Sequence, residues 1–394
     1  MNNNDVFIVS GCRTPIGSLA GTLSSVPAQR LGAATIKEAI SRAGLQVEQI
    51  DEVIMGNVLP AGLGQAPGRQ AALFAGLPQS VECLTINKMC GSGLKSVMLG
   101  AQAIKNEDAS VVIAGGMESM SNAPYLLDKA RTGYRLGHGK ILDSMIIDGL
   151  WDVYNDYHMG NAAELCAKDC NIPRDLQDEY TVMSYKRAQI AQKEGWFKKE
   201  IIPVEIKGRK GDTTVVDADE EPNNVKFDKI PQLKPVFQKE GTVTAANAST
   251  INDGAAALAI MSGKKANEFG ARPVARIVAQ ASHAKAPEWF TTAPADVIEK
   301  VLKKAGMKKD DIGLFEVNEA FAVVSLAVNK IADLDPENVN IHGGAVALGH
   351  PIGASGARIL VTLLHAMERK NVQFGLAAIC IGGGEASAVI VERV

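Results

Sequence analysis

Cys90 is a candidate nucleophile because of the elements that its neighbours predict. A short apolar run at residues 83–86 predicts a strand, and apolar residues follow at helical spacing from Leu94. Cys90 therefore lies at a strand-to-helix turn, where unpaired backbone N–H groups favour a thiolate over a thiol. Gly91 and Gly93 leave room for a substrate carbonyl to approach the backbone. The same pattern fits a buried structural cysteine, so Cys90 alone does not establish catalysis.

Three stretches of the C-terminal half carry further reactive side chains. A strand-like run at residues 314–317 leads into Asn318 and Glu319, which also suit a helix N-terminus. A glycine-rich loop at 342–356 contains His350, a possible base or hydrogen-bond donor. A buried strand ends at Cys380, just before Gly382 and two further glycines. A lone histidine or buried cysteine is more often structural, but two cysteines at strand ends with a loop histidine favour catalysis.

The elements that would hold these side chains alternate between strand and helix. Buried strands are predicted at residues 5–10, 53–58, 110–114 and 255–261, and a helix at 31–43 ends at Gly44. This alternation predicts a parallel sheet covered by helices on both faces. Between about residues 117 and 250 the charge rises and apolar runs thin out, so we interpret this segment as an insertion. Within it, residues 176–193 predict an exposed helix and 207–210 a basic turn.

The last third of the chain repeats the first. Residues 297–306 and 35–44 both read as amphipathic helices that end in Ala-Gly, and 47 positions separate Gly44 from Gly91 and also Gly306 from Gly353. A late apolar strand ends in glycines in both halves. We therefore predict two similar α/β units, although βαβ patterns can resemble one another by chance.

Composition excludes several classes of function. The 394 residues are enough for two or three domains, and the net charge of −3 gives no reason to expect a nucleic-acid partner. No apolar run is long enough for a membrane span, and the N-terminus lacks secretory and transit features. The six cysteines are scattered, and the pair Cys166 and Cys170 lacks the further ligands of a zinc site. We expect a reduced, cytoplasmic setting.

Four motifs together identify the chain as similar to the thiolase family. They are N-K-M-C-G-S-G around Cys90, N-E-A-F at Asn318, G-H-P-I-G-A-S-G-A-R at His350 and C-I-G-G-G at Cys380. The resemblance covers essentially the whole chain and implies a five-layered α-β-α-β-α fold of two duplicated halves with an inserted loop domain. The implied division is residues 1–118 plus 251–271 for the N-terminal half, 119–250 for the CoA-binding loop domain, and 272–394 for the C-terminal half.

The resemblance also implies a reaction and a role for each motif residue. Two acetyl-CoA would be interconverted with acetoacetyl-CoA and CoA, with CoA as substrate or product and not as cofactor. Cys90 would carry the acetyl group, His350 would take its proton, and Cys380 would remove the α-proton of the second acetyl-CoA. His350 and, through a water, Asn318 would form one oxyanion hole, and the backbone N–H groups of Cys90 and Gly382 the other. Glu319 would orient this cluster.

The inserted segment and the C-terminal half would share the binding of CoA. The positions that match the family's CoA contacts are Leu150, His158, Met159, Ala245, Ser249, Ala320 and Phe321. His158 is typical of short-chain members and favours acetoacetyl-CoA over longer substrates. The basic turn at 207–210 is a further candidate for a phosphate contact. Relatives are usually homotetramers, so we expect one here.

Three alternatives stay open at this point. A 3-ketoacyl-CoA thiolase of fatty-acid β-oxidation, with a broader chain-length range, would carry the same motifs. A thiolase-like protein that binds acyl-CoA without turnover would lack at least one catalytic group. The four expected groups, Cys90, Asn318, His350 and Cys380, are all present. A cysteine protease would use Cys, His and Asn but would leave Cys380 unexplained. The segment at 286–291, with Trp289 and Phe290, differs from many bacterial members and bears on the shape of the acyl pocket.

Overall fold

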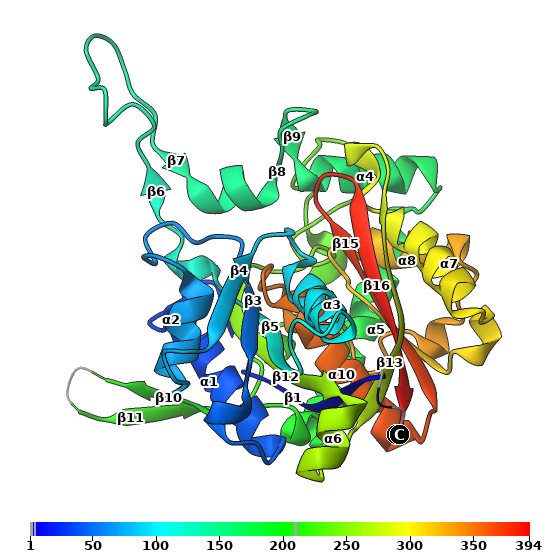
Figure 1. Ribbon diagram of the computed structural model, residues 1–394. Helices are drawn as coiled ribbons and strands as arrows, with labels where there is room; N and C mark the ends of the chain where they lie inside the picture. The colour runs from blue at the N-terminus through cyan, green and yellow to red at the C-terminus, as the bar shows by residue number, and fades with distance from the viewer. Residues whose placement is uncertain (1–2, 4, 209–210) are drawn as a thin grey trace.

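Two halves of the chain form one continuous mixed sheet. The structure, a computed structural model, describes residues 3, 5–208 and 211–394 (Figure 1). The strand order is β14-β15-β16-β13-β1-β12-β5-β3-β4, with β2 (Gly17–Ser18) paired to β12. The N-terminal half contains β1 (Val6–Arg13), α1 (Ala28–Arg42), β3 (Glu52–Gly56), α2 (Pro67–Phe74), β4 (Glu82–Ile86), α3 (Ser92–Lys105), β5 (Val111–Ser119), β12 (Asn252–Ser262) and α6 (Gly263–Phe269).

The C-terminal half repeats this arrangement. Its elements are β13 (Ala275–Ala284), α7 (Ala293–Ala305), β14 (Leu314–Val317), α8 (Ala322–Ile331), α9 (Ala345–Leu348), α10 (Ser355–Lys370), β15 (Phe374–Ile381) and β16 (Glu385–Arg393). The order β3-β5-β12-β1 in one half matches β14-β15-β16-β13 in the other, and each corresponding pair is parallel or antiparallel alike. The predicted duplication is therefore visible in the topology.

Five layers follow from where the apolar side chains lie. Side chains of α1 and α2 pack on the outer face of the N-terminal strands, and those of α7 and α8 on the outer face of the C-terminal strands. The central helices α3 and α10 pack against each other and against the inner faces of both groups of strands. The two groups join through β1 and β13, which share only two residue pairs, Phe7 with Arg276 and Ile8 with Ala275.

The prediction of a parallel sheet is wrong in part. β3 runs parallel to β4 and β5, but β12 is antiparallel to both β5 and β1. In the C-terminal half, β15 and β16 form a hairpin. Gly383 and Gly384 adopt φ values of +90° and +84° at its turn, which side-chain-bearing residues rarely adopt. The glycines after Cys380 thus reverse the chain and do not start a helix.

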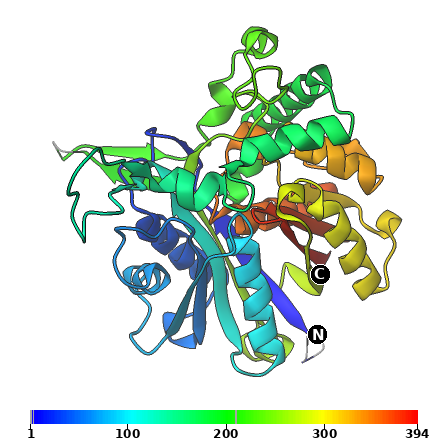
Figure 2. The same cartoon turned by 90° about the horizontal axis from the view of Figure 1, so that it is seen from above.

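The inserted segment lies across one end of both halves and carries a projecting arm (Figures 1 and 2). Its elements are β6 (Tyr125–Leu126), β7 (Leu142–Asp143), β8 (Trp151–Asp152), β9 (Tyr157–His158), α4 (Met159–Asp169), α5 (Arg174–Lys193), β10 (Val204–Lys207) and β11 (Thr213–Val216). The predicted basic turn falls in part on residues 209 and 210, outside the described residues. Among the helices described, none is long and apolar enough to cross a membrane.

The prediction that α5 is an exposed helix is also wrong. Its charged residues suggest a solvated surface, yet Gln177, Asp178, Tyr180 and Ser184 are all buried. They are buried because the helix packs against α8 and α9. Its polar groups hydrogen-bond with Thr242, Asn247 and Glu319 in the neighbouring loops.

Candidate active site

One cavity of about 520 Å³ brings most of the predicted site residues together. Its walls come from both halves and from the inserted segment. Ten of the predicted residues line it: Cys90, Leu150, His158, Met159, Ala245, Ser249, Ala320, Phe321, His350 and Gly382. Asn318 and Cys380 do not line it, and both are fully buried.

The turn that carries Cys90 is closely packed against the C-terminal half. After β4 the chain passes through Met89 at φ +46°, and Gly91 caps α3. A Cβ on Gly91 would lie 2.4 Å from the end of the Ile381 side chain, so a larger residue would require that side chain to move. The backbone N–H of Lys88 donates to Ser92 Oγ at 2.8 Å and closes the turn. Cys90 is thereby fixed at the cavity wall, partly accessible from the cavity.

Cys90 is a thiol in the free protein, contrary to the expected thiolate. Burial raises its pKa to about 11. The backbone N–H groups of Gly382 and of Cys90 itself hydrogen-bond to the sulfur and lower the pKa, but they do not offset the burial. Both N–H groups therefore point toward the Cys90 sulfur at the cavity wall.

His350 is oriented as a neutral base. Ser355 Oγ lies 2.6 Å from His350 Nδ1 and donates its own proton to the carbonyl of Pro351 at 2.9 Å. With that proton engaged, Ser355 accepts from an Nδ1–H, and His350 Nε2 keeps a free lone pair. Burial, and next the charge of Arg358, lower the pKa of His350 to about 3. The ring is thus uncharged near neutral pH.

Asn318 and Arg358 lie behind the His350 side of the cavity. Asn318 follows β14, and Arg358 Nη2 donates to its side-chain oxygen at 3.5 Å. This contact turns the Asn318 amide so that its NH2 group has no partner among the described residues. That NH2 group is available to a bound water, as the expected oxyanion hole needs.

Cys380 is the penultimate residue of β15 and is completely buried. Burial raises its pKa well above the usual value, and ionisation of Cys90 raises it further. The mutual influence of the two sulfurs agrees with a shared site, although Cys380 is a thiol in the free protein. A base at this position has to lose its proton before it acts.

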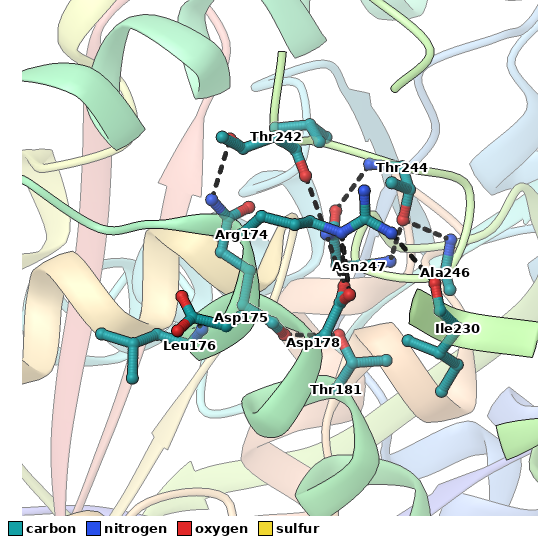
Figure 3. A network of polar contacts seen from close by, with 12 residues as sticks. Arg174, Asp175, Leu176, Asp178, Thr181, Ile230, Thr242, Thr244, Ala246 and Asn247 are labelled. Carbon is teal, nitrogen blue, oxygen red and sulfur yellow. Dashed lines mark hydrogen bonds and ion pairs between the residues drawn. The ribbon is translucent and has the colours of Figure 1, made fainter. Parts of the chain in front are cut away.

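A polar network connects α5 with the cavity wall around Ala245 and Ser249 (Figure 3). Asn247 Nδ2 donates to Asp178 at 3.2 Å, and Arg174 donates to the same carboxylate at 2.8 Å. Asn247 Oδ1 accepts from the backbone of Thr244 at 2.7 Å and shapes the turn before Ser249. The backbone of Asn247 in turn accepts from Ala322 at the start of α8. The two walls of the cavity are thereby connected.

His158 is the N-cap of α4, and this role fixes its tautomer. Its Nδ1 accepts from the backbone N–H of Gly160 at 3.1 Å, so in the neutral ring the proton is on Nε2. Burial lowers the pKa of His158 and favours this neutral form. The ring stacks on Phe237, with 4.8 Å between centroids. His158 therefore offers the cavity an N–H donor.

Several residues of the site were missed or only partly recognised in the sequence. Ser355 was hidden inside the His350 motif, and Asn252, which accepts the backbone N–H of His350 at 2.9 Å, lies 98 positions away. Of the unusual segment at 286–291, Phe290 lines the cavity, whereas Trp289 lines a separate surface hollow. Glu319 accepts hydrogen bonds from α5 and from the loop before His350, and so orients that loop from behind. Across the described residues, no group of three metal-binding side chains occurs.

Comparisons with known proteins agree with this arrangement. Two family models match: "Thiolase, N-terminal domain" over residues 6–264 and "Thiolase, C-terminal domain" over residues 271–393. An acetyl-CoA acetyltransferase of Schizosaccharomyces pombe is 50% identical and covers 100% of both chains. The mitochondrial acetyl-CoA acetyltransferase of Mus musculus is 53% identical, covering 99% of this chain and 91% of its own.

A solved structure shows the same fold. The Acat5 thiolase of Ascaris suum, in complex with coenzyme A, superposes with a TM-score of 0.95 at 45% identity, covering 99% of this chain and 100% of its own. Because the family models, the relatives and the fold all match over nearly the full length, the chain belongs to the thiolase family.

Proposed function

We propose that this chain is an acetyl-CoA C-acetyltransferase that interconverts two acetyl-CoA with acetoacetyl-CoA and CoA. One observation carries the proposal: Cys90 and His350 line a single cavity with the residues expected to bind CoA. The curated relatives named above carry this activity in their names. No metal or redox cofactor is part of the proposed reaction.

The first half of the proposed reaction acetylates Cys90. The sulfur attacks the thioester carbonyl of acetyl-CoA while Nε2 of His350 takes the thiol proton. The developing oxyanion accepts hydrogen bonds from backbone N–H groups, each worth about 2.7–4 kcal/mol in such sites. Collapse of the intermediate forms acetyl-Cys90 and releases CoA, which takes its proton from the thiol of Cys380, while His350 keeps the proton taken from Cys90.

The second half forms the carbon–carbon bond. Cys380, now a thiolate, removes an α-proton from a second acetyl-CoA. The enolate oxygen accepts hydrogen bonds from His350, which carries the proton taken from Cys90, and from a water held by Asn318. The carbanion attacks the carbonyl of acetyl-Cys90, the Cys90 sulfur leaves and takes back its proton from His350, and acetoacetyl-CoA is released. Thiolysis runs the same steps in reverse.

Substrate length is the first test of this proposal. The neutral His158, with its Nε2–H, and the ring of Phe290 narrow the cavity and support a preference for short acyl groups. We expect thiolysis of acetoacetyl-CoA to exceed that of longer 3-ketoacyl-CoAs, with 2-methylacetoacetyl-CoA included to probe the space beside Phe290. Equal or faster turnover of long chains would instead identify a β-oxidation thiolase. An absence of turnover on every substrate would identify an acyl-CoA-binding protein.

Three further proposals concern the protein's organisation and setting. The division at residues 118, 250 and 271 assigns CoA binding chiefly to the inserted segment. A cytoplasmic location is proposed from the sequence alone. The arm at 125–143 exposes Tyr125, Leu136 and Ile141, and this apolar surface supports a homotetramer in which the arms contact other copies. Light scattering that gives a monomer at micromolar concentration would contradict the tetramer.

A further inference from the structure

We propose that Glu118 is a positioning residue that holds the His350 loop against the Cys90 side of the cavity. The proposal rests on the function proposed above, because it assigns Glu118 to the geometry of the acetylation step. Glu118 lies near the end of β5, is fully buried, and does not line the cavity. It acts through the two loops that it joins.

The carboxylate of Glu118 connects the two halves of the molecule. From the N-terminal half, the backbone N–H of Val58 donates to Oε2 at 2.9 Å, the backbone N–H of Leu59 to Oε1 at 3.2 Å, and Asn57 Nδ2 to Oε1 at 2.6 Å. From the C-terminal half, the backbone N–H of Gly353 donates to Oε2 at 2.9 Å. Each carboxylate oxygen thus accepts two hydrogen bonds, and neither donates one, which is the pattern of an ionised carboxylate.

The loop that contains Gly353 also carries the proposed base. Gly353 follows His350 by three residues, and a Cβ on Gly353 would lie 2.6 Å from Oε2 of Glu118. Ile352, which lies between His350 and Gly353 in the sequence, packs on Val58 and Leu59. The same apolar cluster contacts Cys90. The Glu118 bridge therefore sets the distance between the loop that holds the base and the wall that holds the nucleophile.

The charge of Glu118 has a second effect on the same pair. Within the described part of the chain, all its hydrogen-bond partners are N–H groups, and none is a cation. Burial raises the pKa of Glu118 to about 7, whereas the N–H donors lower it. Its negative charge raises the pKa of Cys90 beyond the effect of burial. Glu118 thereby helps to keep Cys90 protonated until His350 takes the proton.

Two substitutions separate position from charge. Glu118→Gln keeps the size, removes the charge and places an NH2 group against N–H donors. Glu118→Asp keeps the charge and shortens the bridge. We expect both to lower kcat for acetoacetyl-CoA thiolysis roughly ten- to hundredfold, the usual effect of a small misplacement, with KM within about twofold. Only Glu118→Gln should shift the pH dependence of Cys90 alkylation by iodoacetamide to lower pH.

The control is Asp253→Asn. Asp253 is another fully buried carboxylate, at the start of the adjacent strand β12, where it accepts from the backbone N–H of Ser121 at 2.9 Å. We expect this variant to keep the wild-type alkylation profile. Wild-type kcat and alkylation in folded Glu118→Gln would overturn the proposal, and if that variant does not fold, wild-type kcat in Glu118→Asp would do so. Alkylation needs no turnover, so an inactive wild type would overturn the proposed function while leaving this test interpretable.

Discussion

At the scale of single residues, Cys90 and His350 lie in the cavity as two neutral groups. Burial raises the pKa of the thiol to about 11 and lowers that of the imidazole to about 3. Neither charged form is favoured in the free protein between these values. The proton therefore moves from sulfur to nitrogen only when a thioester carbonyl is present to take up the developing charge.

This neutral pair makes the alkylation of Cys90 depend on pH in a predictable direction. Since the thiolate is the reactive form, its fraction should increase tenfold for each pH unit below the pKa. We expect the rate with iodoacetamide to rise continuously from pH 7 to pH 10. Intact mass after timed quenching measures this rate. A plateau that begins below pH 8 would instead indicate a preformed thiolate–imidazolium pair.

The two cysteines should fail at different steps when changed to serine. Cys90→Ser should form no acetyl-enzyme with acetyl-CoA, because the hydroxyl is a far weaker nucleophile in the same place. Cys380→Ser should still be acetylated at Cys90 but make almost no acetoacetyl-CoA. Mass spectrometry of the protein and an assay of acetoacetyl-CoA distinguish the steps. Equal acetylation of Cys90→Ser and wild type, or near-normal synthesis by Cys380→Ser, would remove the respective assignment.

At this scale the sequence predicted which residues form the site, but it did not predict whether they are charged. The motifs led to Cys90, His350 and the residues around them, because turn and strand-end patterns are local. The thiolate expected from the helix N-terminus was wrong, because desolvation depends on what packs on the turn from the other half. The orienting role of Ser355 likewise needed the position of the His350 ring.

At the scale of elements, the residue that caps α4 also lines the cavity. His158 caps the helix through Nδ1 and presents Nε2 to the cavity. His158→Asn should keep the cap, because asparagine is among the best N-cap residues, but its shorter side chain places no N–H donor at the position of Nε2. His158→Ala should lose both, with about 0.5–2 kcal/mol of stability from the cap.

Thermal unfolding and kinetics together test this separation. We expect near-wild-type Tm but weaker acetoacetyl-CoA turnover for His158→Asn, and a lower Tm for His158→Ala. If the Tm of His158→Asn is as low as that of His158→Ala, His158 does not stabilise α4 through the cap.

The turn at residues 244–247, which forms part of the cavity wall, depends on α5. Asn247→Ala would leave Asp178 and the Thr244 N–H each without one partner, at a cost of about 1–3 kcal/mol for each buried group left unpaired. Because the turn leads to Ser249, we expect KM for CoA in thiolysis to rise more than kcat falls. Thr181→Ala, which removes a hydroxyl bonded only within α5, serves as the control. An unchanged KM for Asn247→Ala would separate the turn from CoA binding.

Most elements could be predicted from apolar periodicity, including the strands at β1, β5 and β12 and the helices that end at Gly44 and Gly306. Both glycines adopt the positive φ expected of a residue that ends a helix. The burial of α5 could not be predicted, since its polar residues are satisfied by partners such as Glu319, far along the chain. The relative directions of the strands were also not predicted, because they depend on which run of glycines forms the turn of a hairpin.

At the scale of the whole molecule, Arg13 connects β1 to the inserted segment. Its guanidinium donates to Glu200 at 2.6 Å and to Asp219 at 2.6 and 2.8 Å, and all three side chains are buried. Arg13→Met would leave two carboxylates buried without their cation. We expect a loss of about 3–5 kcal/mol in the free energy of unfolding, measured by denaturant titration.

An exposed ion pair provides the comparison. Lys199 and Glu368 also connect the inserted segment with the rest of the chain, but their side chains are 70% and 56% exposed. Lys199→Met should therefore cost less than about 1 kcal/mol. Similar losses for the two variants would mean that the Arg13 cluster contributes no more than a surface contact.

The central position of α3 and α10 has a consequence for synthesis on the ribosome. The apolar face of α3, with Leu94, Val97 and Ala101, packs against α10, which begins only at Ser355. At about 5–20 residues per second, the nascent N-terminal half waits on the order of tens of seconds for that covering. During this interval Cys90 has already been synthesised, and the apolar inner face of α3 beside it is exposed to other chains. The demand for chaperone protection should therefore fall abruptly when α10 leaves the exit tunnel.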